Sequence, residues 1–106
     1  MTGPREFRVV TICGSMRFYD RMVKVAERYT AAGSVVLMPF VAVAADDQDG
    51  EHKAMLDRMH RQKIDMADLV LIVTDKAQYF GDSTMAELEY TKSIGKPYQW
   101  IFEGPV

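Results

Sequence analysis

The chain lacks the features that would assign it to a specialised class of protein. Its 106 residues include one cysteine, Cys13, so no internal disulfide can form, and this usage is typical of a reducing cytoplasm. No apolar run approaches the ~20 residues that a membrane-spanning helix needs, and residues 1–8 lack the hydrophobic region of a signal peptide. The net charge of −2 provides no basic surface for a nucleic acid or an anionic membrane. We therefore expect a cytoplasmic protein that binds neither a membrane nor a nucleic acid polymer.

What the chain does contain is the composition and patterning of a globular α/β protein. Apolar residues make up 48% and charged residues 26%, which suits a single domain covering residues 1–106. Apolar, β-branched runs predict strands at 8–13, 34–40, 68–75 and 98–102. Apolar residues at helical spacing predict helices at 18–32, 51–66 and 83–94. This alternation predicts a small open parallel sheet of four to five strands flanked by helices, in a Rossmann-like or flavodoxin-like three-layer fold.

In such folds, ligands bind beyond the carboxyl ends of the strands, near the point where the strand order reverses. The segments expected at that edge are 14–17, 39–50 and 74–87. The second of these is long and polar and contains three aspartates, so it is a candidate for a mobile flap over the site.

The first segment reads CGSMRF, from Cys13 to Phe18. A glycine directly after a strand allows the backbone to approach a ligand closely. Ser15 offers a hydroxyl at a helix start, and Arg17 offers a planar guanidinium suited to phosphate. These residues predict a small anion site. A helix cap at Ser15 with a solvent-facing Arg17 explains the same residues without any ligand.

The third segment contains GDSTMAE, which begins a helix and places a carboxylate, Glu87, in it. Asp82, Ser83 and Thr84 can each act as N-cap, and Thr84 with Glu87 has the spacing of a capping box. That structural explanation competes with a functional one. Ser83 and Glu87 are four residues apart and share a helix face, so an anion at the helix start would lie beside a carboxylate one turn further on.

Histidine and acidic residues elsewhere show no convincing metal spacing. His52 and His60 are eight residues apart, and no nearby cysteine or acidic pairing gives a convincing zinc spacing. His60 and Asp68 lie in or after a helix that enters its strand from the edge opposite the site, so we expect most of this stretch to lie away from it. Asp68 is expected to form a hydrogen bond at the start of the strand. We expect no metal and no organic cofactor.

Three stretches together resemble a known superfamily: VVTICGSMR, KIDMADLVLIVTD and GDSTMAELEYTKSIGKPYQWI. The chain is similar, over residues 8–102, to the nucleoside 2-deoxyribosyltransferase-like superfamily, which includes deoxyribosyltransferases and nucleoside 5′-monophosphate N-glycosidases. The resemblance is strongest to small bacterial or phage members. It implies a glutamate nucleophile at Glu87 that attacks the anomeric carbon of the sugar, so that the base leaves and a glycosyl-enzyme intermediate forms.

The resemblance also implies a substrate site, a partner class and an assembly. It implies that Gly14, Ser15 and Arg17 contact a nucleotide, that Ser83 and Thr84 hold its phosphate, and that the protein is a homodimer or higher homo-oligomer. The leaving base is expected under the 39–50 loop, stacked on Phe18 or Phe40. The full set of expected substrate-binding residues is Cys13, Gly14, Ser15, Arg17, Phe18, Phe40, Asp82, Ser83 and Thr84.

Three features differ from the superfamily pattern, and one of them is that Ser83-Thr84-Met85 replaces the usual Gly-x-Gly ahead of the glutamate. Thr11 stands where family enzymes have a tyrosine that orients the glutamate, and His60 stands where they have an aspartate that contacts the base or sugar. His60 is a candidate to protonate the leaving base, because its unperturbed pKa of about 6.5 suits that task. Asp57, Tyr79 and Asp82 are candidates to replace the missing groups. The alternatives to an enzyme are a non-catalytic nucleotide-binding module and a protein whose Met-rich helices form an oligomer surface.

Overall fold

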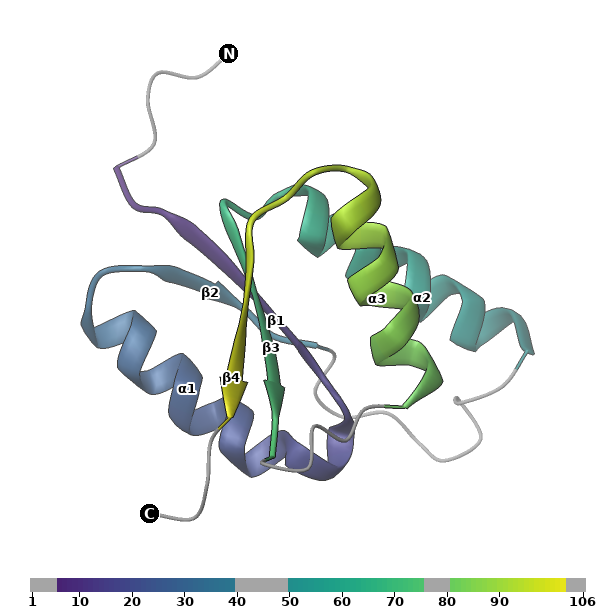
Figure 1. Ribbon diagram of the computed structural model, residues 1–106, viewed down its shortest axis with the longest axis horizontal. Coiled ribbons are helices and arrows are strands. Elements are labelled where there is room, and N and C mark those ends of the chain that lie inside the picture. Colours follow the sequence, from purple (N-terminus) through teal and green to yellow (C-terminus); the bar gives the residue numbers. More distant parts are fainter. Residues whose placement is uncertain (1–5, 40–49, 76–80, 103–106) are drawn as a thin grey trace.

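The computed structural model describes residues 6–39, 50–75 and 81–102, and these form four strands and their connecting helices. In chain order the elements are β1 (Val9–Gly14), the 3₁₀ turn η1 (Met16–Phe18), α1 (Tyr19–Ala31), β2 (Val35–Leu37), α2 (Gly50–Asp65), β3 (Leu69–Thr74), α3 (Asp82–Ser93) and β4 (Tyr98–Phe102). All strand pairs are parallel, in the spatial order β2-β1-β3-β4 (Figure 1). The predicted α/β fold, a small open parallel sheet flanked by helices, is confirmed.

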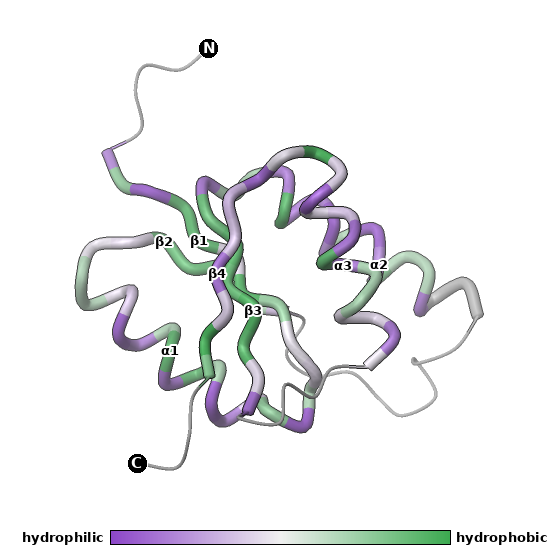
Figure 2. Tube along the Cα trace, viewed as in Figure 1, coloured by the Kyte–Doolittle hydropathy of each residue, from purple (hydrophilic) through white to green (hydrophobic). Residues whose placement is uncertain are grey.

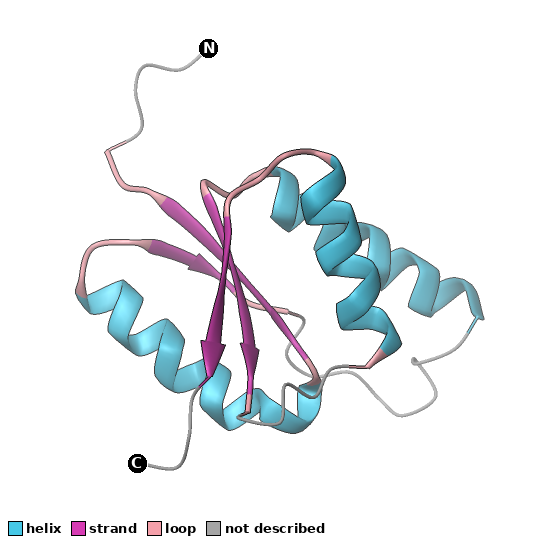
Figure 3. Cartoon of the chain, in the orientation of Figure 1, coloured by secondary structure: helices cyan, strands magenta, loops and turns pink. Residues whose placement is uncertain are grey.

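The strand order reverses at β1, and this separates the helices into two layers. The chain leaves β1 in one direction to form β2 and then crosses to the other side of β1 to form β3. Right-handed crossovers of opposite direction place their helices on opposite faces of a sheet. Accordingly, α1 covers one face, while α2 and α3 lie together on the other (Figure 3). The carboxyl ends of β1 and β3 therefore meet at the switch point.

Each face of the central strands contributes to its own apolar cluster. On the α1 side, Val10, Ile12, Leu71 and Val73 pack with residues of that helix. The alternate residues of the same strands point to the α2 and α3 side. The buried cluster on that side consists of Cys13, Ile64, Ala67, Val70, Ile72 and Leu88. The hydrophobic stretches of the chain coincide with these strands (Figure 2). Burial on both faces explains why the sequence of β3 is continuously apolar.

The predicted element boundaries differ from the structure mainly at β2 and α1. The strand expected at 34–40 is only Val35–Leu37, and the helix expected from residue 18 begins at Tyr19 after the 3₁₀ turn. Ser15 caps that turn as predicted, since its hydroxyl accepts a hydrogen bond from the Arg17 N–H at 3.3 Å. Within the described ranges, no helix has the length and apolar character to span a bilayer.

Gly14, at the end of β1, has no room for a side chain beside β3. A Cβ at this residue would lie 2.7 Å from the main-chain oxygen of Val73, and a main chain cannot move aside as a flexible side chain can. We expect Gly14→Ala to lower the free energy of unfolding by about 1–3 kcal/mol, the usual cost of overpacking. Urea denaturation measures this. The control, Ala54→Ser on the exposed side of α2, should change it by less than about 0.5 kcal/mol. If Gly14→Ala lowers the free energy of unfolding no more than the control does, the close contact between residue 14 and the Val73 main chain is contradicted.

Candidate functional site

A cavity of about 300 Å³ lies at the edge of the sheet where β1 and β3 end. Its wall is formed by the turn after β1, the first two turns of α2 and the start of α3. The lining residues are Gly14, Ser15, Met16, Pro39, Lys53, Leu56, Asp57, Gly81, Asp82, Ser83, Thr84 and Glu87. The position is the one expected for a ligand site in an open parallel sheet. Two segments predicted from sequence to share this edge, the Gly14 turn and the Glu87 helix, do so.

The structure brings seven of the residues singled out in the sequence to the cavity wall and leaves others away from it. The seven are Gly14, Ser15, Asp57, Asp82, Ser83, Thr84 and Glu87. Cys13, Arg17 and Phe18 do not line the cavity. Cys13 is fully buried behind the wall, and Arg17 is exposed on the 3₁₀ turn. Phe40, Tyr79 and most of the 39–50 loop lie outside the described residues.

Phe18 is a correction to the sequence-based prediction. It was expected to stack on a leaving base, but only 6% of it is exposed, and the Arg21 guanidinium lies 5.1 Å from its ring centroid. The 3₁₀ turn places this side chain inside the fold. A packed aromatic ring with a cation over one face is an ordinary structural arrangement.

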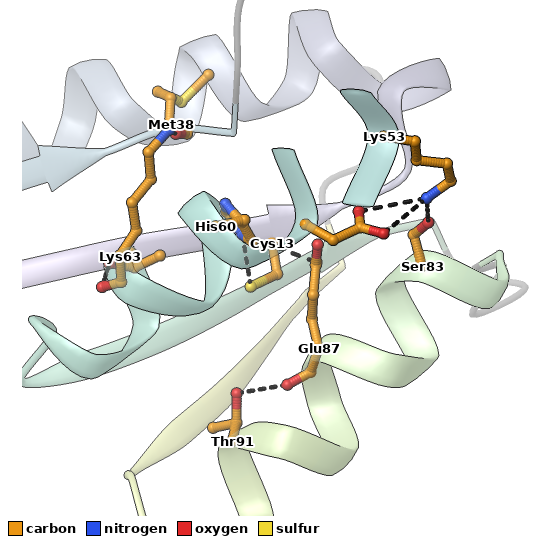
Figure 4. Close-up of polar contacts among 10 residues, drawn as sticks. Cys13, Met38, Lys53, His60, Lys63, Ser83, Glu87 and Thr91 are labelled. Carbon is orange, nitrogen blue, oxygen red and sulfur yellow. Dashed lines mark hydrogen bonds and ion pairs between the residues drawn. The ribbon is translucent and has the colours of Figure 1, made fainter. Parts of the chain in front are cut away.

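The capping explanation for Glu87 is wrong. The N-cap of α3 is Gly81, with no side-chain cap hydrogen bond, so Thr84 and Glu87 both lie inside the helix. The Glu87 side chain instead leans toward the sheet, where its Oε1 lies 3.7 Å from His60 Nε2 (Figure 4). Its exposed fraction is 17%, and it forms part of the cavity wall. The Glu87 carboxyl group therefore does not cap the helix.

Glu87 belongs to a buried polar cluster with Cys13 and His60. His60 is 1% exposed, and its Nε2 also lies 3.3 Å from Cys13 Sγ. Its Nδ1 has no hydrogen-bond partner among the described residues. The cluster joins β1, α2 and α3, elements that are distant in the sequence. The sequence left the place of His60 open, since its stretch was expected to lie mostly away from the site while His60 itself was a candidate proton donor. The structure places it behind the wall, where it contacts Glu87 but does not line the cavity.

Burial shifts the pKa of all three groups toward their neutral forms. Desolvation by burial raises the pKa of Glu87 to about 7, although the hydrogen bond with Cys13 acts to lower it. The nearby Asp57 contributes to the rise, and the more distant cations oppose it. Desolvation, with Lys63 adding to it, lowers the pKa of His60 to about 4. Burial and the neighbouring Glu87 raise the pKa of the Cys13 thiol. At neutral pH, His60 is therefore an uncharged imidazole and a poor proton donor for a leaving base.

Lys53 is a cavity residue that sequence reasoning did not single out. Its Nζ contacts Asp57 Oδ2 at 3.0 Å and donates to Ser83 Oγ at 3.2 Å (Figure 4). The i,i+4 spacing of Lys53 and Asp57 could have suggested their ion pair. The contact with Ser83, thirty positions away, arises only from the packing of α2 beside α3. It puts a cation next to the N-terminus of α3, where backbone N–H groups already favour an anion.

The described ranges thus form a three-layer α/β protein with a carboxylate-bearing cavity at the switch point of its sheet. Among solved structures, a 2-desoxiribosyltransferase from Leishmania mexicana is similar to this chain, with a TM-score of 0.59 and 16% sequence identity. The match covers 92% of this chain and 65% of the neighbour, so the chain spans about two thirds of that protein's length. At this identity the likeness shows the fold alone. No protein-family model and no curated protein sequence matches the chain.

The raised pKa of Glu87 predicts a pH-dependent cost to stability. Folding raises this pKa from 4.5 to about 7, so the folded protein binds more protons between these values and loses stability as pH rises through them. Glu87→Gln lacks this effect. Relative to the wild type, we expect the free energy of unfolding of the variant to increase by up to roughly 3 kcal/mol as the pH rises from 4.5 to 8.

Urea unfolding of both proteins at several pH values measures the difference. Comparing the two proteins cancels most of the titration of His60, whose lowered pKa makes stability rise with pH over an overlapping range. Stability curves for wild type and Glu87→Gln that run parallel from pH 4.5 to 8 would contradict the burial of an ionisable carboxyl group.

Proposed function

We propose that the protein is an enzyme acting at the N-glycosidic bond of a (deoxy)nucleoside 5′-monophosphate, with Glu87 as the nucleophile. The observation that carries the proposal is the position of Glu87. Its carboxyl group is mostly buried, does not cap α3, and forms part of the wall of a cavity that the Gly14 turn also lines. The fold shared with a 2-desoxiribosyltransferase and the sequence resemblance to that superfamily support the same reaction class.

In this mechanism, an ionised Glu87 oxygen attacks the anomeric carbon of the bound sugar. The bond to the base breaks, the base departs with the bonding electrons and takes a proton from solvent, and a glycosyl ester of Glu87 remains. Water then releases the sugar phosphate, or a second base accepts the glycosyl group. With its pKa at about 7, Glu87 can be ionised near neutral pH, as a nucleophile requires.

His60 takes a different part from the one that its ordinary pKa suggested. Because it is buried, uncharged and 3.7 Å from Glu87, we assign it to holding the carboxyl group in place and not to protonating the base. Thr11 cannot replace the family tyrosine as a partner of Glu87, because its hydroxyl donates to the Lys63 carbonyl at 2.7 Å. Asp57, on the cavity wall beside Lys53, is the group that we propose accepts hydrogen bonds from the sugar.

The start of α3 is the proposed phosphate subsite. Ser83 and Thr84 lie on the cavity wall in the first turn of the helix, and Lys53 supplies the positive charge. Gly14 and Ser15 line the same cavity from the end of β1 and are proposed to contact the sugar. The proposal includes a cytoplasmic location and a homo-oligomeric assembly, for which the lone cysteine and the resemblance are the respective supports.

The alternative is a nucleotide-binding module without turnover. What favours it is that His60 faces Cys13 and Glu87, so that none of the imidazole atoms reaches the cavity wall. In that case Glu87 accepts hydrogen bonds from the ribose hydroxyls.

Loss of the Glu87 carboxylate tests the enzymatic proposal. Wild-type protein incubated with a panel of ribo- and deoxyribonucleoside 5′-monophosphates should release free base, detected by chromatography. Glu87→Gln should reduce the rate by at least about a thousandfold, because no covalent intermediate can form. Glu89→Gln is the matched control on the exposed side of the same helix and should keep the rate.

Two results would count against catalysis by Glu87. Base release by Glu87→Gln at the wild-type rate would exclude it as the nucleophile. A monophosphate that raises the melting temperature of the wild type without any base release would favour the binding module, because a ligand specific for the folded state stabilises it.

Removal of the Lys53 charge tests the phosphate subsite. Lys53→Gln should weaken binding of a nucleoside 5′-monophosphate by about 10- to 100-fold, as expected for a lost charge-assisted hydrogen bond, and leave binding of the parent nucleoside within about twofold. Isothermal titration calorimetry gives both constants without requiring turnover. Lys24→Gln, on the exposed surface of α1, removes the same charge at a distance and should have no effect. Equal losses for nucleotide and nucleoside would place the phosphate elsewhere.

A further inference from the structure

The cluster of Cys13, His60 and Glu87 has a second chemical capacity, separate from glycosidic chemistry. Among the described residues, one sulfur, one imidazole nitrogen and one carboxylate oxygen all lie within 4.8 Å of one another. These are the ligand types that Zn²⁺ takes in proteins. We propose that the three side chains form a binding site for Zn²⁺, with a fourth coordination position directed to the cavity. Sequence spacing did not indicate it, because the ligands come from three separate elements.

The distances between the ligand atoms fit tetrahedral coordination. Zinc bonds of about 2.3 Å to sulfur and about 2.0–2.1 Å to nitrogen or oxygen place two ligand atoms roughly 3.3–3.6 Å apart. Cys13 Sγ and His60 Nε2 are 3.3 Å apart, and His60 Nε2 and Glu87 Oε1 are 3.7 Å apart. The third edge is bounded by 4.8 Å, so a small rotation of the Glu87 carboxyl group closes the triangle.

Charge and burial make a dication a suitable occupant of this place. A Cys13 thiolate and a Glu87 carboxylate carry two negative charges, which Zn²⁺ neutralises, while His60 contributes an uncharged lone pair. The thiol and carboxyl protons leave to solvent as the metal bonds form. Cys13 is fully buried and His60 is 1% exposed, whereas Glu87 is 17% exposed at the cavity wall. The ion therefore enters through the cavity, and its fourth ligand is a cavity water.

Metal occupancy would change the function of the site. Zinc bonded to one oxygen of Glu87 withdraws negative charge from the whole carboxylate and makes it a poor nucleophile toward a sugar carbon, so the zinc-bound form is an inhibited form of the enzyme. This consequence rests on the proposed function, whereas the metal site itself does not.

Cobalt(II) is the probe for the site, because a thiolate bound to Co²⁺ gives a near-ultraviolet charge-transfer band and tetrahedral Co²⁺ gives strong visible bands. The chain has one cysteine, so any such band reports Cys13. We expect the full chain to bind one Co²⁺, which Zn²⁺ displaces. Cys13→Ser should abolish the charge-transfer band, and His60→Gln and Glu87→Gln should each weaken binding at least tenfold. His52→Gln, which removes the other histidine, should bind as the wild type.

The outcomes separate the metal site from the proposed enzyme. Absence of a charge-transfer band for wild-type protein with excess Co²⁺ overturns the site, and no variant is needed for that result. A band that His60→Gln or Glu87→Gln leaves at wild-type affinity, in variants with wild-type circular dichroism, overturns the three-ligand site. If base release occurs, zinc at saturating concentration should abolish it and a chelator should restore it; unchanged base release overturns the inhibitory role. Metal binding without any base release supports the site and counts against the proposed function alone.

Discussion

The parallel pairing of β1 with β3 is the constraint on which the cavity depends. The pairing runs from Val10 opposite Leu69 to Gly14 opposite Val73. Asp68 secures its beginning: its Oδ2 accepts a hydrogen bond from the Val9 N–H at 2.8 Å, and its own N–H donates to the Val9 carbonyl at 2.7 Å. Because the chain crosses from one side of β1 to the other between β2 and β3, the two strands end together with α2 and α3 on a single face. The cavity occupies the space that this arrangement leaves at the carboxyl edge.

The same pairing has an electrostatic consequence behind the cavity wall. Side-chain alternation turns Cys13 toward the α2 and α3 layer, where the other members of the buried cluster are apolar. His60 and Glu87 meet it there, so three ionisable groups share a site of low polarity. Burial shifts the pKa of each group toward its neutral form. Placing three ionisable groups in such a site is not what stability alone would favour. Such departures from a purely apolar core are concentrated at functional sites. Both the proposed enzymatic function and the proposed zinc site use this cluster.

The cavity itself combines two kinds of surface. On the α3 side, Lys53 and the helix start offer positive charge to an anion. Toward the sheet, Glu87 offers a carboxyl group whose protonation changes near neutral pH. A nucleoside monophosphate has the matching pair of features, a phosphate and an electrophilic carbon, within one small molecule. This complementarity links the phosphate subsite to the nucleophile in a single proposal.

Much of the fold could be predicted from local patterns. Continuous apolar runs located all four strands, and the alternation of strands and helices predicted the parallel sheet. The glycine after β1 and the shared face of Ser83 and Glu87 correctly predicted which segments reach the cavity. The prediction was wrong where the local sequence allowed two arrangements equally well and tertiary packing determined which one forms. Gly81, and not the hydroxyls after it, caps α3, and the 3₁₀ turn buries Phe18.

The sequence by itself determined the layer order of the fold and the edge at which a site could form, because both follow from periodicity and from the handedness of crossovers. Only the tertiary structure decided which side chains meet there. Lys53 with Ser83, and Cys13 with His60 and Glu87, are separated by 27 or more positions in the chain. Contacts of that kind depend on how α2 and α3 pack against the sheet, and no spacing rule within one element contains that information.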